Sequence, residues 1–559
     1  MKKMMLSIVV LIVVDSVLPQ TAVDFSSSNL PIVIIDTRGR VIEDAHKIDA
    51  DMRIIDNGVG RRNLVTDQSF TYNGIIGIET RGSSTLQFPK KQFAIETRDA
   101  AGAGLNVSLL GLPEENDWIL DAPFSDKTLM RNVLAYRLSN DLGHYASRTR
   151  YCELILNGNY WGVYVLMEKI KRDKNRVAVA KLDSADVTAP KITGGYILKV
   201  DKPAGENVGG WRSEMPLFLA GATGPSPFYQ FHYPKPDQIR PEQAAYIKGF
   251  ITDFEKMMAG PEYDDPAGGM WTALDMGSVM DFVIINELSK NVDGYRLSSF
   301  LYKDRDDRDP RLHLGPVWDF NIAFGNADYN MEHVVHGWQI EYFLTNERFN
   351  KGGDRYMIPF WWGKIWYSPR FQNKLYQRWR QLRRTALDLD RLLDFIDATA
   401  RQLDEAQQRN FTAWPILGQY VWPNDFAVGS TYQDEVNTLK QWLRERIEWM
   451  DEHLRFDPAE VAKDHEAIGD FRLGANYPNP FNASTAIPLF LDRPGEWTVE
   501  VYNLLGKPIA TLHRGMLPAG ETRLRWHGLE EGGKAAPTGV YYVRAAGAFT
   551  DMIKIILMR

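Results

Sequence analysis

The chain has 559 residues, enough for about three or four domains. Its hydrophobic content of 44% is that of a globular protein with an ample core. The net charge is −7 and no long basic run occurs, which argues against nucleic acid as a partner. The single cysteine, Cys152, excludes an intramolecular disulfide. Because it stands in the apolar run 151–156, we expect a buried thiol rather than a nucleophile.

The first 22 residues have the layout of a secretory signal peptide. Lys2 and Lys3 precede an apolar run at 4–14, and Ala22 offers a cleavage point. A membrane anchor or an apolar first strand is the alternative, but the run is short for a bilayer and Asp15 interrupts it. We therefore expect an exported chain without a stable transmembrane segment.

Short apolar runs follow the signal at 30–36, 52–56, 69–72 and 74–80, and they are typical of strands. We expect residues 23–75 to form a small β region. It would lead into the core that follows, as a sandwich packed on it.

A turn of small residues holds Arg81, Ser83 and Ser84, and Lys90 and Lys91 open the strand after it. Free backbone N–H groups in such a turn can cover phosphates, and a lysine beside it can reach their oxygens. An ordinary hairpin with surface lysines is the alternative.

The next helix is predicted over 128–142, with Arg131 and Asn132 in its first turn. The helix dipole disfavours a cation there, which suggests a specific anionic partner for Arg131, either a phosphate or a buried acid. A plain surface arginine is equally compatible with the pattern. The clearest hairpin follows at 153–167 around an Asn-Gly turn, and its second strand runs up to Glu168.

A further strand at 194–202 carries Lys199. Residues 205–235 are rich in glycine, proline and aromatics and are typical of an inserted lid or substrate loop. A helix is predicted over 241–258, and another over 275–288 with polar capping residues at its start.

Two acids then stand in unusual settings. Asp293 follows the end of the helix, and Asp319 lies in an apolar, strand-like segment, with the predicted strand 299–302 between them. A helix, a loop and two strands would bring both acids to one cleft. Phosphoryl transfer needs such a pair, one carboxylate to orient a hydroxyl and one to hold a divalent ion. Alternatively, each acid only caps a turn or a strand.

The remainder of this region is helical, with apolar spacing at 371–387, 390–409 and 432–454. A loop rich in tryptophan, proline and glycine lies at 413–429, and the polar segment 457–470 is predicted to be a linker. Beyond it, residues 471–559 show short strands alternating with turns, which predicts a β-sandwich.

Several motifs in one order resemble the CotH kinase-like family, which is named for a spore coat protein and is distantly related in fold to protein kinases. The resemblance implies a CotH domain at 76–456. It is carried by IETRGSSTLQFPKKQFAIETRD, ENDWILDAPFSDKTLMRNVLAYRL, LILNGNYWGVYVLMEKIKRDKNRV, TGGYILKVDK and the segment 287–326 that holds the two acids.

The resemblance implies an α+β, atypical protein-kinase-like core that uses ATP with Mg²⁺ or Mn²⁺. Asp293 takes the role of the catalytic acid and Asp319 that of the metal ligand. The nucleotide would be contacted by residues of the small-residue turn, the strands and the first helix: Arg81, Ser83, Ser84, Lys90 or Lys91, Arg131, Glu168 and Lys199.

The chain departs from the family pattern at two metal-binding positions. An asparagine ligand is common a few residues after the first acid, but this neighbourhood offers only Ser298. The second acid of a Trp-Asp-Phe-Asp pattern is Asn321, whose amide oxygen brings less charge to the metal. Asn291 is a possible substitute ligand. These changes put the activity of this member in doubt.

The tail motifs NYPNPFN, VYNLLGKPI and PTGVYYVRA, with the final KIILMR, resemble the C-terminal sorting domain of type IX secretion cargo, an FlgD-like immunoglobulin fold. This implies export by the type IX machinery of a Gram-negative bacterium, removal of the tail, and a secreted or cell-surface protein. A carbohydrate-binding β module is the alternative.

The sequence therefore favours a secreted or surface kinase that phosphorylates serine or threonine of another secreted or surface protein. The competing hypothesis is a non-catalytic binding or assembly protein on a kinase-like scaffold. The high aromatic content adds association with glycans as a further possibility.

Overall fold

The computed structural model describes residues 20–44, 46–203, 208–215, 226–350, 357–425, 428–455, 471–474, 476–491, 494–503, 507–546 and 550–558. The chain forms two compact units. The first comprises Met1–Ser368 and Leu375–Arg455, and the second Pro369–Lys374 and Phe456–Arg559. Residues 1–19 of the predicted signal peptide 1–22 and the predicted linker 457–470 lie outside the described residues.

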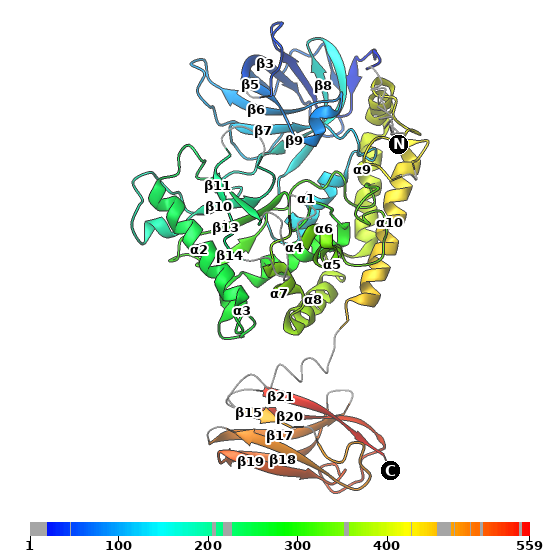
Figure 1. Cartoon of the computed structure of the whole chain (residues 1–559). Helices are drawn as coiled ribbons and strands as arrows, with labels where there is room; N and C mark the ends of the chain where they lie inside the picture. Colours follow the sequence, from blue (N-terminus) through cyan, green and yellow to red (C-terminus); the bar gives the residue numbers. More distant parts are fainter. Residues whose placement is uncertain are drawn as a thin grey trace, which may run out of the picture. The chain divides into compact units, whose positions relative to one another are not determined.

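The first unit begins with a closed barrel, drawn in blue to cyan in Figure 1. Its core is a cluster of buried aliphatic and aromatic side chains that includes Cys152, which is 0% exposed, as predicted. Around the barrel the strands run in the order β2 (Ile32–Asp36), β3 (Ile48–Ile55), β5 (Tyr72–Arg81), β6 (Gln92–Arg98), β7 (Asp117–Asp121), β9 (Asn159–Glu168) and β8 (Thr149–Leu156).

The prediction of a separate N-terminal β layer is wrong in one respect. Strand β2 pairs in parallel with β8, and β3 pairs with β5, so the early strands complete the same barrel as the later ones. The reason lies in the sequence of β2, which is apolar on both faces. Val33 and Ile35 enter the barrel core, while Ile32 packs in a second cluster with Ile55 and Ile155.

The predicted hairpin of β8 and β9 is confirmed. Asn157 and Gly158 at its turn have φ of 50° and 77°, the two positive values that a tight hairpin turn requires. Helix α1 (Arg131–Asp141) lies between β7 and β8 in sequence and starts three residues after the predicted 128.

Below the barrel in Figure 1 lies a five-stranded antiparallel sheet. The predicted insertion 205–235 contributes two of its strands, and its residues 216–225 lie outside the described part. The sheet order is β11 (Gly210–Arg212), β12 (Phe228–Tyr233), β10 (Tyr196–Val200), β13 (Ser299–Lys303) and β14 (Leu312–Leu314).

Helices surround this sheet and one side of the barrel (Figure 1). Helix α9 (Leu389–Ala413) packs against β9 and also against α10 (Tyr432–His453). The helices after α1 are α2 (Pro241–Ala259), α3 (Gly269–Ala273), α4 (Met276–Ser289), α5 (Gln339–Thr345), α6 (Glu347–Asn350), α7 (Trp361–Trp366), α8 (Pro369–Leu382), α9 (Leu389–Ala413) and α10 (Tyr432–His453).

The second unit holds two antiparallel sheets whose inward side chains form one core. Alternate residues of β16 are buried, as expected for a strand with one face on a core. One sheet contains β15 (Phe471–Leu473), β16 (Thr485–Leu491) and β19 (Gly520–Trp526), and the other β18 (Pro508–Leu517), β17 (Gly495–Asn503), β20 (Gly539–Ala546) and β21 (Thr550–Leu557).

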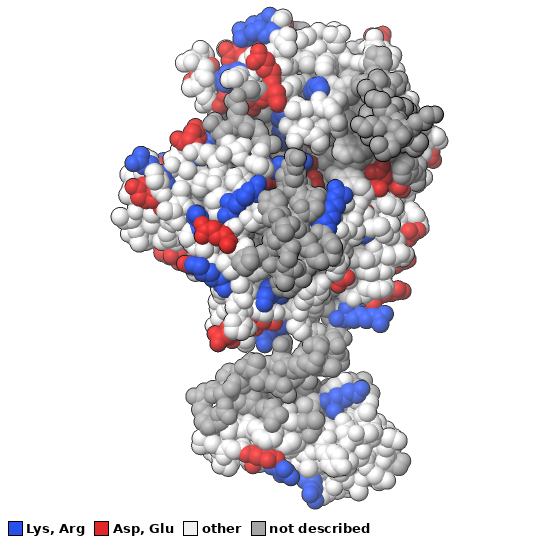
Figure 2. Space-filling model, viewed as in Figure 1, with Lys and Arg blue, Asp and Glu red and all other residues white. Residues whose placement is uncertain are grey.

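The predicted α+β class is confirmed by this mixture of helices and mainly antiparallel sheets. Within the described residues, no helix combines the length and the apolar character needed to cross a bilayer. On the face drawn in Figure 2, lysines and arginines are interspersed with acids among the described residues.

Candidate functional site

Asp293 lies in a tight turn that begins where α4 ends. Asp275 caps the start of this helix, and Lys290 ends it in the left-handed region with φ 47°. The Asn291 side chain then accepts the backbone N–H of Asp293 at 3.1 Å, and the Asp293 carbonyl accepts Leu297 N–H at 2.8 Å. Hydrogen bonds to both the N–H and the carbonyl group of Asp293 therefore fix its position.

Asp319 lies in a loop and not on a second strand, which corrects the prediction. Strand β14 ends at Leu314, and Asp319 adopts φ 68°, a left-handed value that no strand residue has. Its N–H donates to the Tyr136 hydroxyl at 3.2 Å, and Ser298 Oγ lies 3.5 Å from Asp319 Oδ2. The Asp293–Ser298 turn therefore adjoins Asp319.

The charges around Asp319 make a strongly acidic setting. Burial, together with the carboxylates of Asp293, Asp201 and Asp121, raises the pKa of its carboxyl to about 7. Only Arg81 among the named neighbours lowers it. A bound cation would relieve this accumulation of negative charge.

Backbone strain gathers at the same place. The non-glycine residues Tyr295, Ser298, Asp319 and Phe324 have φ of 69°, 47°, 68° and 56°. Such conformations cost roughly 1–3 kcal/mol each and persist where the surrounding structure imposes them. Their clustering around the two acids marks this region as the candidate functional site.

Helix α1 is hydrogen-bonded to the loop that contains Asp319. The Asn132 side chain accepts Phe320 N–H at 2.7 Å and donates to Asp121 at 3.2 Å. Arg131 is 2% exposed, and its guanidinium donates to Asp126 at 2.6 Å. Of the two anionic partners considered for Arg131, the structure has the buried acid.

Arg81 is the cation that faces the acids. Its guanidinium donates to Gln92 at 2.8 Å and lies over the Trp318 ring, with 5.6 Å to the ring centroid. Trp318 in turn stacks on Tyr136, with centroids 5.8 Å apart. This stack fixes the residue directly before Asp319.

The other candidates in and after the small-residue turn differ in their exposure to solvent. Ser83 and Ser84 are exposed, and the Lys91 ammonium donates to the Leu86 carbonyl inside the turn. Lys90 is only 1% exposed, and its ammonium donates to Val163 O at 2.6 Å and to the Asn410 side chain at 2.9 Å. Lys90 thus joins the barrel to α9.

Two further candidates have charged partners. The Glu168 carboxylate is fully buried and forms an ion pair with Arg148 at 2.7 Å, with Arg176 at 3.8 Å. Lys199 is partly exposed and lies 3.2 Å from Asp201. Because Asp201 raises the pKa of Asp319, Lys199 belongs to the surroundings of the acid pair, whereas the Glu168 carboxylate is committed to its arginines.

Asn291 and Asn321, the two asparagines considered as metal ligands, differ in burial and in the groups that form their hydrogen bonds. Asn291 is 2% exposed, and its side chain is already engaged with Asp293 N–H and with Asn286. Asn321 is half-buried, and its backbone carbonyl accepts the Asn326 side chain at 2.7 Å.

Sequence reasoning missed several residues of this site. Asp201 directly follows the strand of Lys199. This position of a carboxylate beside a lysine-bearing strand was the local pattern that could have indicated it. Asp121 and Tyr136 gave no local signal.

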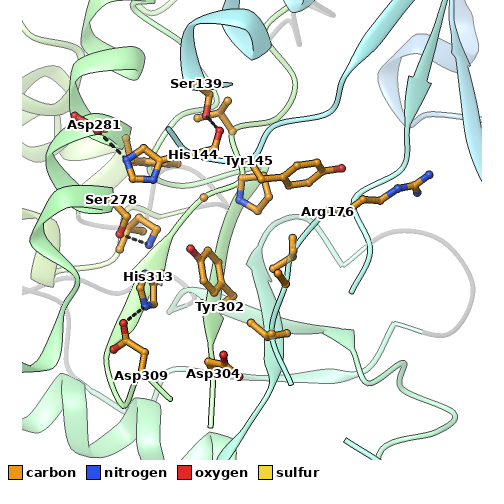
Figure 3. Close-up of a pocket in the computed structure, with 18 of the residues that line it drawn as sticks. Ser139, His144, Tyr145, Arg176, Ser278, Asp281, Tyr302, Asp304, Asp309 and His313 are labelled. Atoms are coloured by element: carbon orange, nitrogen blue, oxygen red, sulfur yellow. Dashed lines mark hydrogen bonds and ion pairs between the residues drawn. The ribbon is translucent and has the colours of Figure 1, made fainter. Parts of the chain in front are cut away.

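A separate cavity of about 330 Å³ lies between α4, the end of α1 and strands β13 and β14. Figure 3 shows the Tyr302 hydroxyl and the His144 ring directed into it. His144 Nε2 lies 2.7 Å from Asp281, which also accepts two hydrogen bonds from Arg378 at 2.8 Å. Neither Asp293 nor Asp319 lines this cavity.

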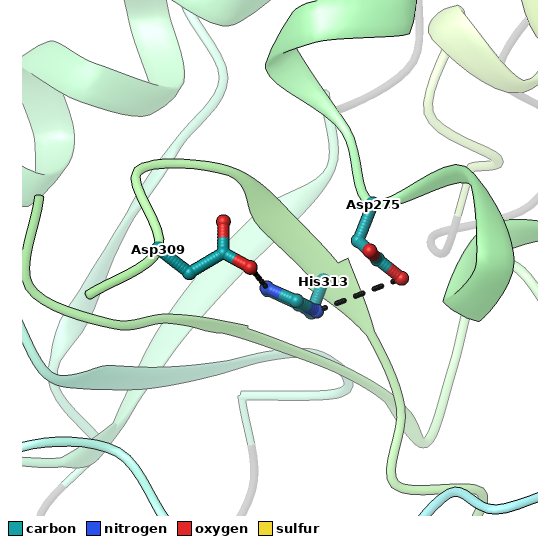
Figure 4. Close-up of side chains that lie close together, drawn as sticks. All are labelled: Asp275, Asp309 and His313. Atoms are coloured by element: carbon teal, nitrogen blue, oxygen red, sulfur yellow. Dashed lines mark hydrogen bonds and ion pairs between the residues drawn. The ribbon is translucent and has the colours of Figure 1, made fainter.

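One group of possible metal ligands lies at its edge, within the described residues (Figure 4). His313 has Asp309 at 3.1 Å on one side and Asp275 at 3.8 Å on the other. Arg311 forms ion pairs with both acids, at 2.6 and 2.9 Å. Arg311 therefore engages both carboxylates and offsets one of their two negative charges, and we call this group the closed ion network.

The family model described as CotH kinase protein matches residues 78–450, well over half of the chain. The chain belongs to this family. Membership implies an ATP-dependent activity that uses a divalent metal. Both acids and the strained loops around them fall inside the matched residues.

No curated protein matches the chain. Among solved structures, dimeric latent PorU from Porphyromonas gingivalis is similar at 17% identity over 16% of this chain and 10% of its own, with a TM-score of 0.14. PorZ, described as an essential surface component of the type-IX secretion system of Porphyromonas gingivalis, is similar at 17% identity over 15% of this chain and 11% of its own, with a TM-score of 0.12. The chain thus spans about a tenth of either protein.

The Pseudomonas fluorescens alkylpurine DNA glycosylase AlkC, bound to DNA containing an abasic site analog, is similar at 12% identity over 39% of this chain and 75% of its own, with a TM-score of 0.13. These TM-scores are too low to relate the folds.

Proposed function

We propose that this protein is a secreted or surface kinase of CotH type, which transfers phosphate from ATP to a serine or threonine of another secreted or surface protein. The observation that carries this proposal is the junction of the two acids, where Ser298 of the Asp293 turn reaches Asp319 at 3.5 Å. The proposal includes a protein-kinase-like arrangement of the barrel and the helical part around this junction.

The residues present fit a divalent ion and phosphates. Asp319 is surrounded by Asp293, Asp201 and Asp121, whose charges raise its pKa beyond the effect of burial, so a metal ion would be stabilised there. Asp319 would hold Mg²⁺ or Mn²⁺ with Asn321, Ser298 or Asn291. The bound metal and ATP would supply the transferable phosphoryl group and the neutralisation of its charge.

The chain's own residues would bind and orient the reactants. Asp293 would accept the hydrogen bond of the acceptor hydroxyl and orient it, and Arg81 and Lys199 offer positive charge beside the acids. The exposed Ser83 and Ser84, with Lys91, would cover the nucleotide. Lys90, Arg131 and Glu168 would support these elements through their buried partners.

The decisive experiment is transfer of labelled phosphate from ATP by the full chain with Mg²⁺ or Mn²⁺, beside Asp293→Asn and Asp319→Asn. We expect label on the protein or on an added acceptor, and a loss of about 10²–10⁴-fold in either variant. Asp309→Asn is the matched control, because this acid lies in the closed ion network and not at the junction. It should keep full activity.

The non-catalytic alternative rests on Asn321 and Ser298 standing where the family uses stronger ligands. Absence of label, together with a melting temperature that ATP and Mg²⁺ leave unchanged, would refute the kinase proposal and leave a binding protein. A nucleotide-dependent rise in melting temperature without label would place the defect in catalysis alone.

We propose further that residues 471–559 are a type IX sorting domain. The ordered tail motifs support this, and the two sheets with one core are compatible with an independently folding module. Fused to a reporter in a bacterium that has this secretion system, the tail should bring the reporter to the cell surface and be removed. A reporter retained inside the cell would contradict the proposal.

A further inference from the structure

Three large apolar side chains are exposed close to the acid pair. Met331, Tyr420 and Trp422 are 47%, 46% and 44% exposed. Trp422 stacks on Tyr329, with ring centroids 6.3 Å apart and planes within 5°. We call these four residues the aromatic platform. Large apolar side chains that are exposed on neighbouring loops are typical of a binding surface.

The platform is built from two loops that are bonded to each other. The Tyr420 hydroxyl donates to Asp328 at 2.5 Å, Asp328 N–H donates to the Pro423 carbonyl at 2.9 Å, and the Asn424 side chain donates to Asn326 at 3.0 Å. Residues 420–424 of the predicted tryptophan- and proline-rich loop, which the proposed kinase reaction does not use, are thereby fixed to the segment that follows Asp319. A rigid surface loses little entropy on binding.

The same two loops are anchored to the elements that carry the acids. The Lys290 ammonium donates to the Met331 carbonyl at 2.7 Å, and Lys290 directly precedes the Asp293 turn. The buried Glu332 carboxylate accepts Gly325 N–H at 2.7 Å and Ala327 N–H at 2.8 Å. The platform therefore cannot shift without moving the segment of Asp319 or the end of α4.

The inner end of the platform lies within electrostatic reach of both acids. Burial raises the pKa of the Tyr329 phenol, and the carboxylates of Asp293 and Asp319 raise it further. A ligand on Trp422 and Tyr420 would thus extend towards the residue that orients the acceptor hydroxyl.

We infer that the aromatic platform binds an apolar or aromatic side chain of the acceptor polypeptide, near the serine or threonine that receives phosphate. This inference rests on the proposed kinase function and names its substrate class. An extended polypeptide advances about 3.3–3.6 Å per residue, so the residue that occupies the platform would stand at a fixed offset from the acceptor serine or threonine. Met331 adds a flexible aliphatic surface, which favours a peptide side chain over a sugar ring.

The test uses the full chain with ATP and Mg²⁺ and a set of synthetic peptides. Each peptide has one serine and one tryptophan, and the tryptophan is moved residue by residue away from the serine. We expect one offset to give a KM about tenfold lower than the peptide without tryptophan, with kcat unchanged. Trp422→Ala and Met331→Ala should abolish this advantage without changing kcat. Tyr367→Ala, which removes another aromatic of 50% exposure, is the matched control and should preserve it.

Binding of the same peptides, followed by calorimetry without ATP, separates this inference from the proposed function. If no peptide is labelled but the tryptophan peptide binds and Trp422→Ala abolishes that binding, the platform stands and the kinase function fails. If peptides are labelled with equal KM at every offset, the platform inference is overturned. It is also overturned if oligosaccharides bind in a Trp422-dependent manner and the peptides do not.

Discussion

At the scale of single residues, the site combines buried charge with backbone strain. Asp319 and Glu332 lie in the same segment, 319–332. Burial raises the pKa of both carboxyls. Gly325 lies between them with φ 78°, directly against the Trp442 ring. Substitutions of Glu332 and Gly325 should therefore change the free energy of unfolding.

Glu332 should make the folded state less stable as pH rises. Burial raises the pKa of its carboxyl to about 8, whereas the unfolded chain releases this proton near 4.5. The folded state therefore holds more protons between these values, and the unfolding free energy falls through this window, by at most about 1.4 kcal/mol per pH unit. Relative to the wild type, Glu332→Gln should gain stability from pH 5 to pH 8 in urea titrations. Parallel pH profiles would contradict the assignment.

Gly325 should tolerate no side chain. An added Cβ would lie 2.6 Å from the Trp442 ring, in a conformation with φ 78°. Gly337 has the same φ of 78° but nothing within 4 Å, so it isolates the backbone cost. We expect Gly325→Ala to lower the unfolding free energy by about 2–4 kcal/mol and Gly337→Ala by about 1 kcal/mol. Equal losses in denaturant titrations would show that the tryptophan gives way.

At the scale of elements, α1 links the barrel to the Asp319 loop. Its first turn carries Asn132 and Arg131, and the helix dipole alone would not favour the positive charge of Arg131 there. Asp126 compensates the arginine, while Asn132 bonds Phe320 on one side and Asp121 on the other. The unusual composition of this turn therefore follows from its contacts with the site.

Loss of the Arg131 charge should be costly for this reason. Arg131→Met would leave the Asp126 carboxylate buried without its partner, which typically costs about 3–5 kcal/mol. On the same helix, Arg137 pairs with Asp141 while 47% exposed, and Arg137→Met should cost less than about 1 kcal/mol. Thermal unfolding of both variants makes the comparison. A small effect at Arg131 would indicate that Asp126 is protonated or hydrated in its absence.

At the scale of the whole molecule, the chain has two units with separate cores. Calorimetry of the full chain should therefore show two unfolding transitions. A chain that ends at residue 455 should lose the transition of smaller enthalpy, because the enthalpy of unfolding scales with the number of residues ordered. A single transition in the full chain would show that the units unfold together.

Elements whose hydrogen bonds are local could be predicted from the amino-acid sequence. The Asn-Gly turn predicted the β8–β9 hairpin, a polar cap and apolar spacing predicted α4, and helical spacing predicted α9 and α10. The ordered motifs also identified the family. Local patterns suffice in these cases because turn geometry, capping and periodic burial involve residues only a few positions apart.

Contacts between side chains that are distant in sequence could not be predicted and depend on the folded chain. Lys90 finds its acceptor in Asn410, 320 residues away, so its local pattern beside the turn could not exclude a role in phosphate binding. The charge of Asp201 raises the pKa of Asp319, although the two residues are far apart in sequence. Asp319 has a left-handed backbone conformation in place of the predicted strand conformation. Burial and charge at these positions depend on distant neighbours, and no local pattern in the sequence specifies them.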